Sequence, residues 1–226
     1  MITPTYNEAG SITLLVDRLA SSLAGREWEL VVVDDGSPDG TAEIAAALAP
    51  ARPVRVVRRA GKAGLASAVI AGMKETRGDP LVVMDADLSH PPEIVPALVD
   101  AISAGADLAV GSRYVRGGAT MDWPLRRRVV SRVACLMGSV LVPVRDATSG
   151  FFAVRKSAID GVRLNAIGFK IGLEVIARAR ASRIVEVPYT FRDRELGKSK
   201  FGRREIIQYV VQLGQIARDK VRGRLR

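Results

Sequence analysis

The sequence of 226 residues and 24.2 kDa is 48% hydrophobic and 26% charged, a composition that excludes disorder, collagen and a bare coiled coil for the whole chain. One cysteine, Cys135, and one histidine, His90, exclude an internal disulfide framework and a multi-cysteine zinc site, and they argue against a histidine-ligated metal or a histidine-based catalytic triad. The net charge of +10 suits an anionic partner, such as nucleic acid, anionic lipid or a phosphorylated substrate.

Strand-like and helix-like segments alternate over the first half of the chain. Near-continuous apolar runs, typical of strands buried on both faces of a parallel sheet, cover residues 30–33, 54–57, 81–84 and 107–110. Helical patterns lie between them at 12–19, 41–49 and 63–74, and Pro91-Pro92 begins another. The first strand is short, since only Ile2 and Thr3 precede Pro4. This order predicts a right-handed, doubly wound, mostly parallel α/β sheet.

Beyond Gly111 the alternation stops. A polar loop over 112–123 precedes a helix expected from 124 to about 141, and further strands are expected at 151–154 and 184–187. An amphipathic helix is predicted from 203 to about 221. Residues 200–226 hold eight basic and two acidic residues, a net charge of +6, against +4 for the rest. We expect one main domain over 1–200 and a basic amphipathic C-terminal helix over 201–226.

No apolar run approaches the roughly 20 residues of a membrane-spanning helix. No secretory signal is visible at the N-terminus either. We therefore expect a cytoplasmic protein that is soluble or lies at a membrane surface.

Acidic residues follow several of the expected strands, at the edge where open parallel sheets bind ligands. They are Glu8, Asp34-Asp35, Asp85 with Asp87, and Asp146. A pair such as Asp85 and Asp87 presents oxygens suited to Mg²⁺ or Mn²⁺ beside a diphosphate. The alternative for this pair is a turn at the strand end followed by a helix cap.

Asp34 and Asp35 are harder to explain by local structure alone. Ser37, Asp39 and Thr41 suit a turn or a helix cap, which accounts for the second half of the segment. Two adjacent carboxylates at the end of a buried strand repel each other. A ligand that offers hydrogen-bond donors, such as a base or a ribose, is one explanation.

Some basic residues are candidates for binding phosphate. Arg113 and Arg194 lie in loops expected near the carboxyl edge of the sheet. Arg127 and Ser131 are four residues apart in the first turns of an expected helix and face one side, as in a phosphate site, although a solvated basic face is the alternative. His90, beside Pro91, is interpreted as a residue at a helix start rather than a metal ligand.

Seven segments then stand in a recognisable order, at 4–8, 33–41, 85–91, 111–114, 123–124, 146–152 and 191–200. The first three resemble the inverting family 2 glycosyltransferases of the GT-A fold, which is Rossmann-like. The later four narrow the resemblance to the dolichol-phosphate mannosyltransferases, called polyprenol-phosphate mannose synthases in bacteria. The combination of motifs is far more specific than any one of them.

The resemblance implies a role for each matching residue. The guanosine of GDP-mannose would be held by Pro4, Tyr6, Glu8, Val33 and Asp35. Asp85, Ala86 and Asp87 would contact the diphosphate and the sugar. Asp87 would be the main ligand of Mg²⁺ or Mn²⁺, and Asp85 would assist.

The same resemblance assigns the cations. Arg113, Arg194 and Lys200 would grip phosphates or the sugar, and Arg127 and Ser131 would join Arg113 and Arg194 in seating the acceptor phosphate. Two positions depart from the pattern. Ser89 stands where some relatives have a glutamine that completes the metal shell, so the third ligand is open. Lys198 stands where glutamate is frequent.

The implied reaction moves mannose from GDP-mannose to a polyprenyl or dolichyl monophosphate, with inversion from α to β. A phosphate monoester is ionised near pH 7, since its second pKa is about 6, so no strong general base is needed. The lipid acceptor implies a peripheral position on the cytoplasmic face of a membrane, through surface helices or a separate anchoring partner. For the C-terminal helix, packing on the core is the alternative to membrane contact.

Two other functions remain open from the sequence. A polyprenyl-phosphate glucosyltransferase using UDP-glucose would share the fold and the metal site. A non-catalytic nucleic-acid-binding α/β protein would explain the charge. It would leave the carboxylates at the strand ends unexplained, and 5% aromatic residues offer few platforms for stacking bases. We therefore expect no nucleic-acid partner.

Overall fold

A seven-stranded sheet organises the computed structural model of the chain, which describes residues 1–165, 170–192 and 203–225, with the side chains of 203 and 204 left out. The strands follow the order β3-β2-β1-β4-β7-β5-β8. Their bounds are β1 (Ile2–Thr5), β2 (Leu30–Asp34), β3 (Val54–Arg58), β4 (Leu81–Val83), β5 (Leu108–Ser112), β7 (Phe152–Val154) and β8 (Ile184–Pro188). The expected doubly wound, mostly parallel sheet is confirmed.

The length of β1 and the direction of β7 differ from what the local sequence indicates. The first strand was expected to be short, but it extends through Thr5. It pairs in parallel with β2 at four positions, from Ile2 opposite Val31 to Thr5 opposite Asp34. Strand β7 runs antiparallel between β4 and β5, with Phe152 opposite both Val83 and Val110. Because β7 begins where β4 and β5 end, the segment that precedes it lies at the carboxyl edge of the sheet.

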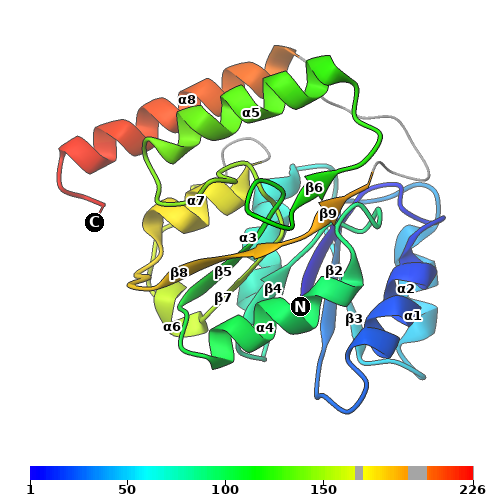
Figure 1. The fold of residues 1–226 in the computed structure, drawn as a ribbon. Helices are drawn as coiled ribbons and strands as arrows, with labels where there is room; N and C mark the ends of the chain where they lie inside the picture. The colour runs from blue at the N-terminus through cyan, green and yellow to red at the C-terminus, as the bar shows by residue number, and fades with distance from the viewer. Residues whose placement is uncertain (166–169, 193–202, 226) are drawn as a thin grey trace.

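Helices cover both faces of the sheet (Figure 1). One face packs against α1 (Ile12–Ser22), α2 (Thr41–Leu48) and α4 (Val95–Ser103), which follows the short helix η1 (Pro92–Ile94). The other face packs against α3 (Leu65–Glu75), α6 (Lys156–Ile159) and α7 (Ile171–Arg178). Gly72 lets α3 approach closely, because a Cβ there would collide with the side chain of Ile2. Of these helices, α6 and α7 were not expected from the sequence.

Two further helices, α5 (Leu125–Ser139) and α8 (Arg203–Val221), lie side by side above α7 (Figure 1). Both match their predicted ranges to within two residues. Helix α8 joins the core through Tyr209, Leu213 and Ile216, which belong to the same apolar cluster as α3 and α7. The boundary expected between residues 200 and 201 lies outside the described residues. No described helix combines the length and apolar character that crossing a bilayer requires.

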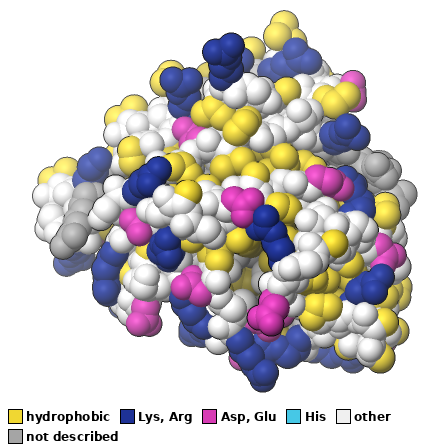
Figure 2. Space-filling model, turned by 60° about the horizontal axis from the view of Figure 1, so that its bottom comes forward, with side chains coloured by type: hydrophobic (Ala, Val, Ile, Leu, Met, Phe, Trp, Pro, Cys, Tyr) yellow, Lys and Arg dark blue, Asp and Glu magenta, His cyan; other side chains and the backbone are white. Residues whose placement is uncertain are grey.

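A small second sheet and scattered charges complete the surface. Strands β6 (Ala119–Thr120) and β9 (Thr190–Phe191) pair in parallel beside the carboxyl edge. On the face shown in Figure 2, Lys and Arg side chains are interspersed with Asp and Glu. Elsewhere in the described structure, the ion pairs Arg18–Glu93 at 2.7 Å and Arg26–Asp100 at 2.6 Å tie α1 and the segment after it to η1 and α4.

Candidate active site

The loops that follow β1 and β2 are joined to each other by hydrogen bonds. The backbone N–H of Glu8 donates to the Thr41 hydroxyl at 2.9 Å, and that of Asn7 donates to the Ser37 hydroxyl at 3.0 Å. Asp34 is buried and accepts hydrogen bonds from the Thr5 hydroxyl at 2.9 Å and the Ser37 N–H at 2.8 Å. Hydrogen bonds from the protein itself therefore satisfy the Asp34 carboxylate, and they hold the turn after β2 in shape.

Asp35 faces the loop between β3 and α3. Its carboxylate pairs with Arg59 at 2.7 Å and accepts the backbone N–H groups of Ala63 at 3.1 Å and Gly64 at 3.0 Å. The repulsion expected between the two adjacent carboxylates is thus offset by Arg59. Lys62, from the same loop, lies 4.2 Å from the centre of the Tyr6 ring.

The five residues assigned to the nucleoside lie close together in the fold. Pro4 and Val33 are partners in the β1–β2 ladder, Tyr6 and Glu8 follow β1, and Asp35 follows β2. Val33 and Asp35 are buried, whereas Pro4, Tyr6 and Glu8 are half-buried. Their contact with a nucleotide remains a prediction.

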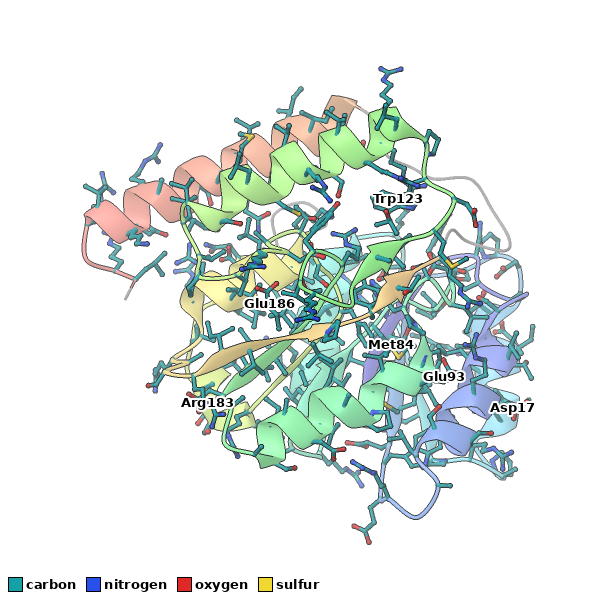
Figure 3. The ribbon with its side chains drawn as sticks, viewed as in Figure 1. Asp17, Met84, Glu93, Trp123, Arg183 and Glu186 are labelled. Atoms are coloured by element: carbon teal, nitrogen blue, oxygen red, sulfur yellow. The ribbon has the colours of Figure 1, made fainter. Side chains whose placement is uncertain are left out.

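The turn after β4 carries Asp85, Ala86 and Asp87. Asp87 is buried, and its Oδ1 accepts the backbone N–H of Ser89 at 3.0 Å. Leu88 reaches the left-handed region, with φ of 62°, so that the chain folds back on itself. Asp85 and Asp87 therefore lie on one tight turn at the carboxyl end of β4, directly after Met84, which Figure 3 labels.

His90 supports this turn from within the protein. Its Nδ1 accepts the backbone N–H of Asp85 at 3.0 Å, and its ring stacks on Phe151 with centroids 5.0 Å apart. Burial lowers the pKa of His90 below its ordinary value, although Asp85 and Asp87 act in the opposite direction. A neutral ring whose Nδ1 is already used for a hydrogen bond suits support of the backbone better than metal binding.

Few of the described side chains could act as ligands of a metal ion. Within residues 1–165, 170–192 and 203–225, no three His, Cys, Asp or Glu side chains are grouped so as to hold an ion. Asp85, which is half-buried, and Asp87, which is buried, offer carboxylate oxygens on one turn, and Ser89 is buried next to them in the chain. Mg²⁺ is commonly held by one or two carboxylates together with substrate phosphates and water. The residues present fit such an ion, with its remaining ligands outside the protein.

Arg113 is held by the segment that precedes β7. Its Nε and Nη2 donate to the two oxygens of Asp146 at 2.7 and 2.6 Å, and Nη2 also donates to the Thr148 hydroxyl at 2.8 Å. Burial alone would lower the pKa of Arg113 and raise that of Asp146. The ion pair outweighs burial for both, so the pKa of Arg113 is raised and that of Asp146 is lowered. The Glu186 carboxylate, whose residue is labelled in Figure 3, in turn accepts a hydrogen bond from the Asp146 backbone N–H at 3.0 Å.

Asp146 therefore has a clear part in the site, as the buried anion that orients Arg113. The expected loop position of Arg113 near the carboxyl edge is confirmed, because Arg113 directly follows β5. Sequence reasoning did not foresee the pairing. The partners are 33 residues apart, and no local pattern connects them.

The start of α5 lies next to Arg113. Trp123, labelled in Figure 3 on the loop that leads to α5, has the Arg127 guanidinium 4.1 Å from its ring centre and that of Arg113 at 5.5 Å. Ser131 accepts a hydrogen bond from the Tyr114 hydroxyl at 2.7 Å. Arg127 and Ser131 are both half-buried, which confirms that they share the inward side of the helix.

Aromatic rings join the basic and acidic parts of the site. Phe191 contacts Trp123 edge-on at 5.1 Å and lies 6.1 Å from His90, which supports the Asp85 turn. The acidic turn and the basic start of α5 thus belong to one contiguous region. Arg194, Lys198 and Lys200 lie outside the described residues, so their assignments remain predictions.

Lys170 is a site residue that the sequence did not indicate. It immediately precedes α7, and its Nζ donates to the Thr148 carbonyl at 2.9 Å. Burial and the nearby Arg113 charge lower the pKa of Lys170 to about 8. The local sequence around a single lysine before a short helix does not indicate that the lysine is buried beside Arg113.

Comparisons with known proteins agree with the resemblance seen in the motifs. The family model described as Glycosyl transferase family 2 matches residues 1–163. A dolichol-phosphate mannosyltransferase of Pyrococcus furiosus is 48% identical over 93% of this chain, which spans 61% of that protein's length. A polyprenol monophosphomannose synthase of Mycolicibacterium smegmatis is 42% identical over 100% of this chain and 88% of its own length.

Two further similarities extend the comparison. A dolichol-phosphate mannosyltransferase of Saccharomyces cerevisiae is 40% identical over 96% of this chain and 85% of its own. Among solved structures, a Mycobacterium tuberculosis glucosyl-3-phosphoglycerate synthase in complex with Mn²⁺, UDP-glucose and phosphoglyceric acid has a TM-score of 0.68 at 23% identity, covering 94% of this chain and 78% of that one. This last likeness establishes the fold alone.

Proposed function

The chain belongs to glycosyl transferase family 2, and from this premise we propose that it transfers mannose from GDP-mannose to a polyprenyl or dolichyl monophosphate, with inversion to a β linkage. The mannosyltransferase names of three relatives at 40–48% identity support the sugar and the acceptor. One observation carries the proposal on the structural side. An acidic turn at Asp85 and Asp87 and a basic helix start at Arg127 meet across Trp123 and Phe191 at a single sheet edge.

The donor is assigned to the carboxyl ends of β1, β2 and β4. Pro4, Tyr6, Glu8, Val33 and Asp35 would hold the guanosine, and the turn at 85–87 would face the diphosphate and the sugar. Asp87 and Asp85 would hold Mg²⁺ or Mn²⁺. Such an ion stabilises the negative charge that the departing GDP acquires. The Mn²⁺ in the structurally similar synthase is consistent with this choice.

The acceptor phosphate is assigned to Arg113, Arg127, Ser131 and Arg194. A phosphate oxygen would attack the anomeric carbon on the face opposite GDP. Arg113 is buried and doubly bonded to Asp146, so its charge keeps one position while the substrate binds. The only histidine is buried with a lowered pKa, which agrees with a reaction that needs no histidine base.

We propose further that α5 and α8 hold the protein on the cytoplasmic face of a membrane. Exposed apolar side chains line both helices: Leu125, Val129, Val130, Val133, Leu136 and Met137 on α5, and Ile206, Ile207, Val210 and Val211 on α8. Basic residues flank them, as at Arg126, Arg128 and Arg218. An apolar face bordered by cations suits an anionic lipid surface, where a polyprenyl chain resides.

Point variants test this surface better than removal of α8, because Tyr209, Leu213 and Ile216 belong to the core. Ile207→Asp with Val211→Asp places two charges on the exposed face. Losing the burial of two such side chains costs about 3 kcal/mol, which lowers binding to anionic liposomes by roughly a hundredfold. Leu14→Asp with Ala47→Asp, on α1 and α2, is the matched control. Unchanged liposome binding of the first variant would reject lipid contact through this face of α8, and a wild type that does not bind liposomes would favour an anchoring partner.

Binding of the donor is tested by thermal unfolding in the presence of candidate nucleotides. GDP-mannose with Mn²⁺ should raise the unfolding temperature more than UDP-glucose with Mn²⁺, and GDP should reproduce most of the effect. Asp87→Ala should lose the part that depends on Mn²⁺. A larger shift with UDP-glucose would replace the proposed donor with the glucosyl one.

A further inference from the structure

A chain of hydrogen bonds links α8 to Arg113. The side-chain amide of Gln212, in the middle of α8, donates to the Lys170 carbonyl at 3.1 Å. The Lys170 ammonium donates to the Thr148 carbonyl at 2.9 Å, and Arg113 donates to the Thr148 hydroxyl at 2.8 Å. Lys170 and Arg113 are thus both tethered to Thr148, one to its backbone and the other to its side chain.

The first link begins at a buried side chain. Gln212 is 2% exposed and lies among the apolar residues Tyr209, Leu213 and Ile216 of α8. A buried amide is costly unless it is hydrogen-bonded, and packing alone would be served by a leucine. The polar side chain at this position is therefore explained by its bond to Lys170.

The surrounding contacts leave little freedom between α8, α7 and the segment before β7. Arg178 of α7 donates to Asp219 of α8 at 2.7 Å. At the other end of α7, a Cβ on Gly172 would collide with the Ser149 carbonyl oxygen, so the helix start presses directly on this segment. Contacts at both ends of α7 therefore connect α8 to the segment that holds Thr148.

We propose that Gln212 is a positioning residue of the transfer reaction, which holds Lys170 and Thr148 in place behind Arg113 and so connects α8 to the acceptor phosphate. This inference rests on the proposed function, in which Arg113 binds that phosphate. It gives α8 a second task beside its contact with lipid. The helix that meets the membrane also sets the geometry of the cation that receives the lipid's phosphate.

The test compares Gln212→Leu with Gln215→Leu, the same substitution three residues further along α8. Farnesyl phosphate in detergent serves as a short acceptor, which removes membrane binding from the measurement. Gln212→Leu should raise the KM for farnesyl phosphate about tenfold, the scale of one lost buried hydrogen bond, and leave the KM for the sugar nucleotide unchanged. Gln215→Leu should match the wild type in both.

A merely structural role would reduce the folded fraction, which lowers the apparent kcat and leaves both KM values unchanged. That result for Gln212→Leu would overturn the inference. If Gln212→Leu does not fold, Lys170→Met tests the next link. A selective rise in the KM for farnesyl phosphate supports the connection, and an unchanged KM refutes it. Calorimetry measures the binding of farnesyl phosphate in the absence of the sugar nucleotide, and it therefore tests the inference independently of transfer. If the wild type shows no transfer, only the proposed function is rejected.

Discussion

The buried pair of Arg113 and Asp146 gives the most direct prediction of stability. Asp146 is 0% exposed and accepts three hydrogen bonds from Arg113, from Nε at 2.7 Å, Nη2 at 2.6 Å and the backbone N–H at 2.9 Å. Asp146→Asn keeps the size of the side chain but leaves the guanidinium without its buried counter-charge. Breaking such a pair typically costs about 3 to 5 kcal/mol.

The lower end of that range applies, because asparagine retains one oxygen acceptor. A loss of about 3 kcal/mol corresponds to a fall of roughly 6 to 12 °C in the unfolding temperature of a chain of this size. Urea unfolding at pH 7 measures the free energy, and thermal unfolding measures the midpoint. Asp100→Asn, which breaks the exposed Arg26–Asp100 pair, should leave the midpoint near that of the wild type.

The pH dependence supplies a second check on the same variant. The pKa of Asp146 is lowered in the folded protein, so its contribution is fully present above the unfolded pKa of about 3.9 and is lost as the pH falls through the lower folded value. The difference between wild type and Asp146→Asn should therefore be constant from about pH 5 upward and shrink below about pH 4. A difference under about 1 kcal/mol at pH 7, or one that grows in acid, would refute the reasoning.

Three further predictions follow from single contacts. The ring resonances of His90, the only histidine, should titrate in NMR spectra with a midpoint below the ordinary value of about 6.5, because burial lowers its pKa; a midpoint at or above about 6.5 would contradict this. Tyr209→Phe removes the hydrogen bond to the Ala134 carbonyl at 2.6 Å and should cost about 1 kcal/mol in urea unfolding; an unchanged midpoint would argue against the bond. Gly72→Ala should cost about 1 to 3 kcal/mol through its collision with Ile2, whereas Gly214→Ala, with nothing within 4 Å of its Cβ, should not destabilise; equal effects of the two would contradict the packing.

Features of the fold and of the candidate site that depend on local pattern can be predicted from the sequence. Apolar runs such as 30–33 and 81–84 indicated strands because strands covered on both faces need such runs. The spacing of Arg127 and Ser131 placed both on the inward side of α5, since residues four apart share a helix face. The Asp85 and Asp87 turn was found because a strand signal directly precedes it.

Features that depend on distant parts of the chain were not predictable in this way. The direction of β7 is set by its neighbours β4 and β5, and an apolar run carries no direction. Asp34 and Asp35 suggest a ligand because two of their partners, Thr5 and Arg59, lie far away in the sequence. The links from Arg113 to Asp146 and from Gln212 to Lys170 join residues more than 30 positions apart. Only the fold brings such partners together.

The central claim is tested most directly by transfer of labelled mannose. The protein is incubated with Mn²⁺, undecaprenyl phosphate in anionic vesicles, and either GDP-[¹⁴C]mannose or UDP-[¹⁴C]glucose, and the radioactivity in the organic extract is counted. We predict labelled lipid from GDP-mannose and none from UDP-glucose. The labelled product should be lost in Asp87→Ala and retained in Asp17→Ala, which removes a carboxylate on α1. Labelled lipid from UDP-glucose only, or undiminished mannose transfer by Asp87→Ala, would contradict the account.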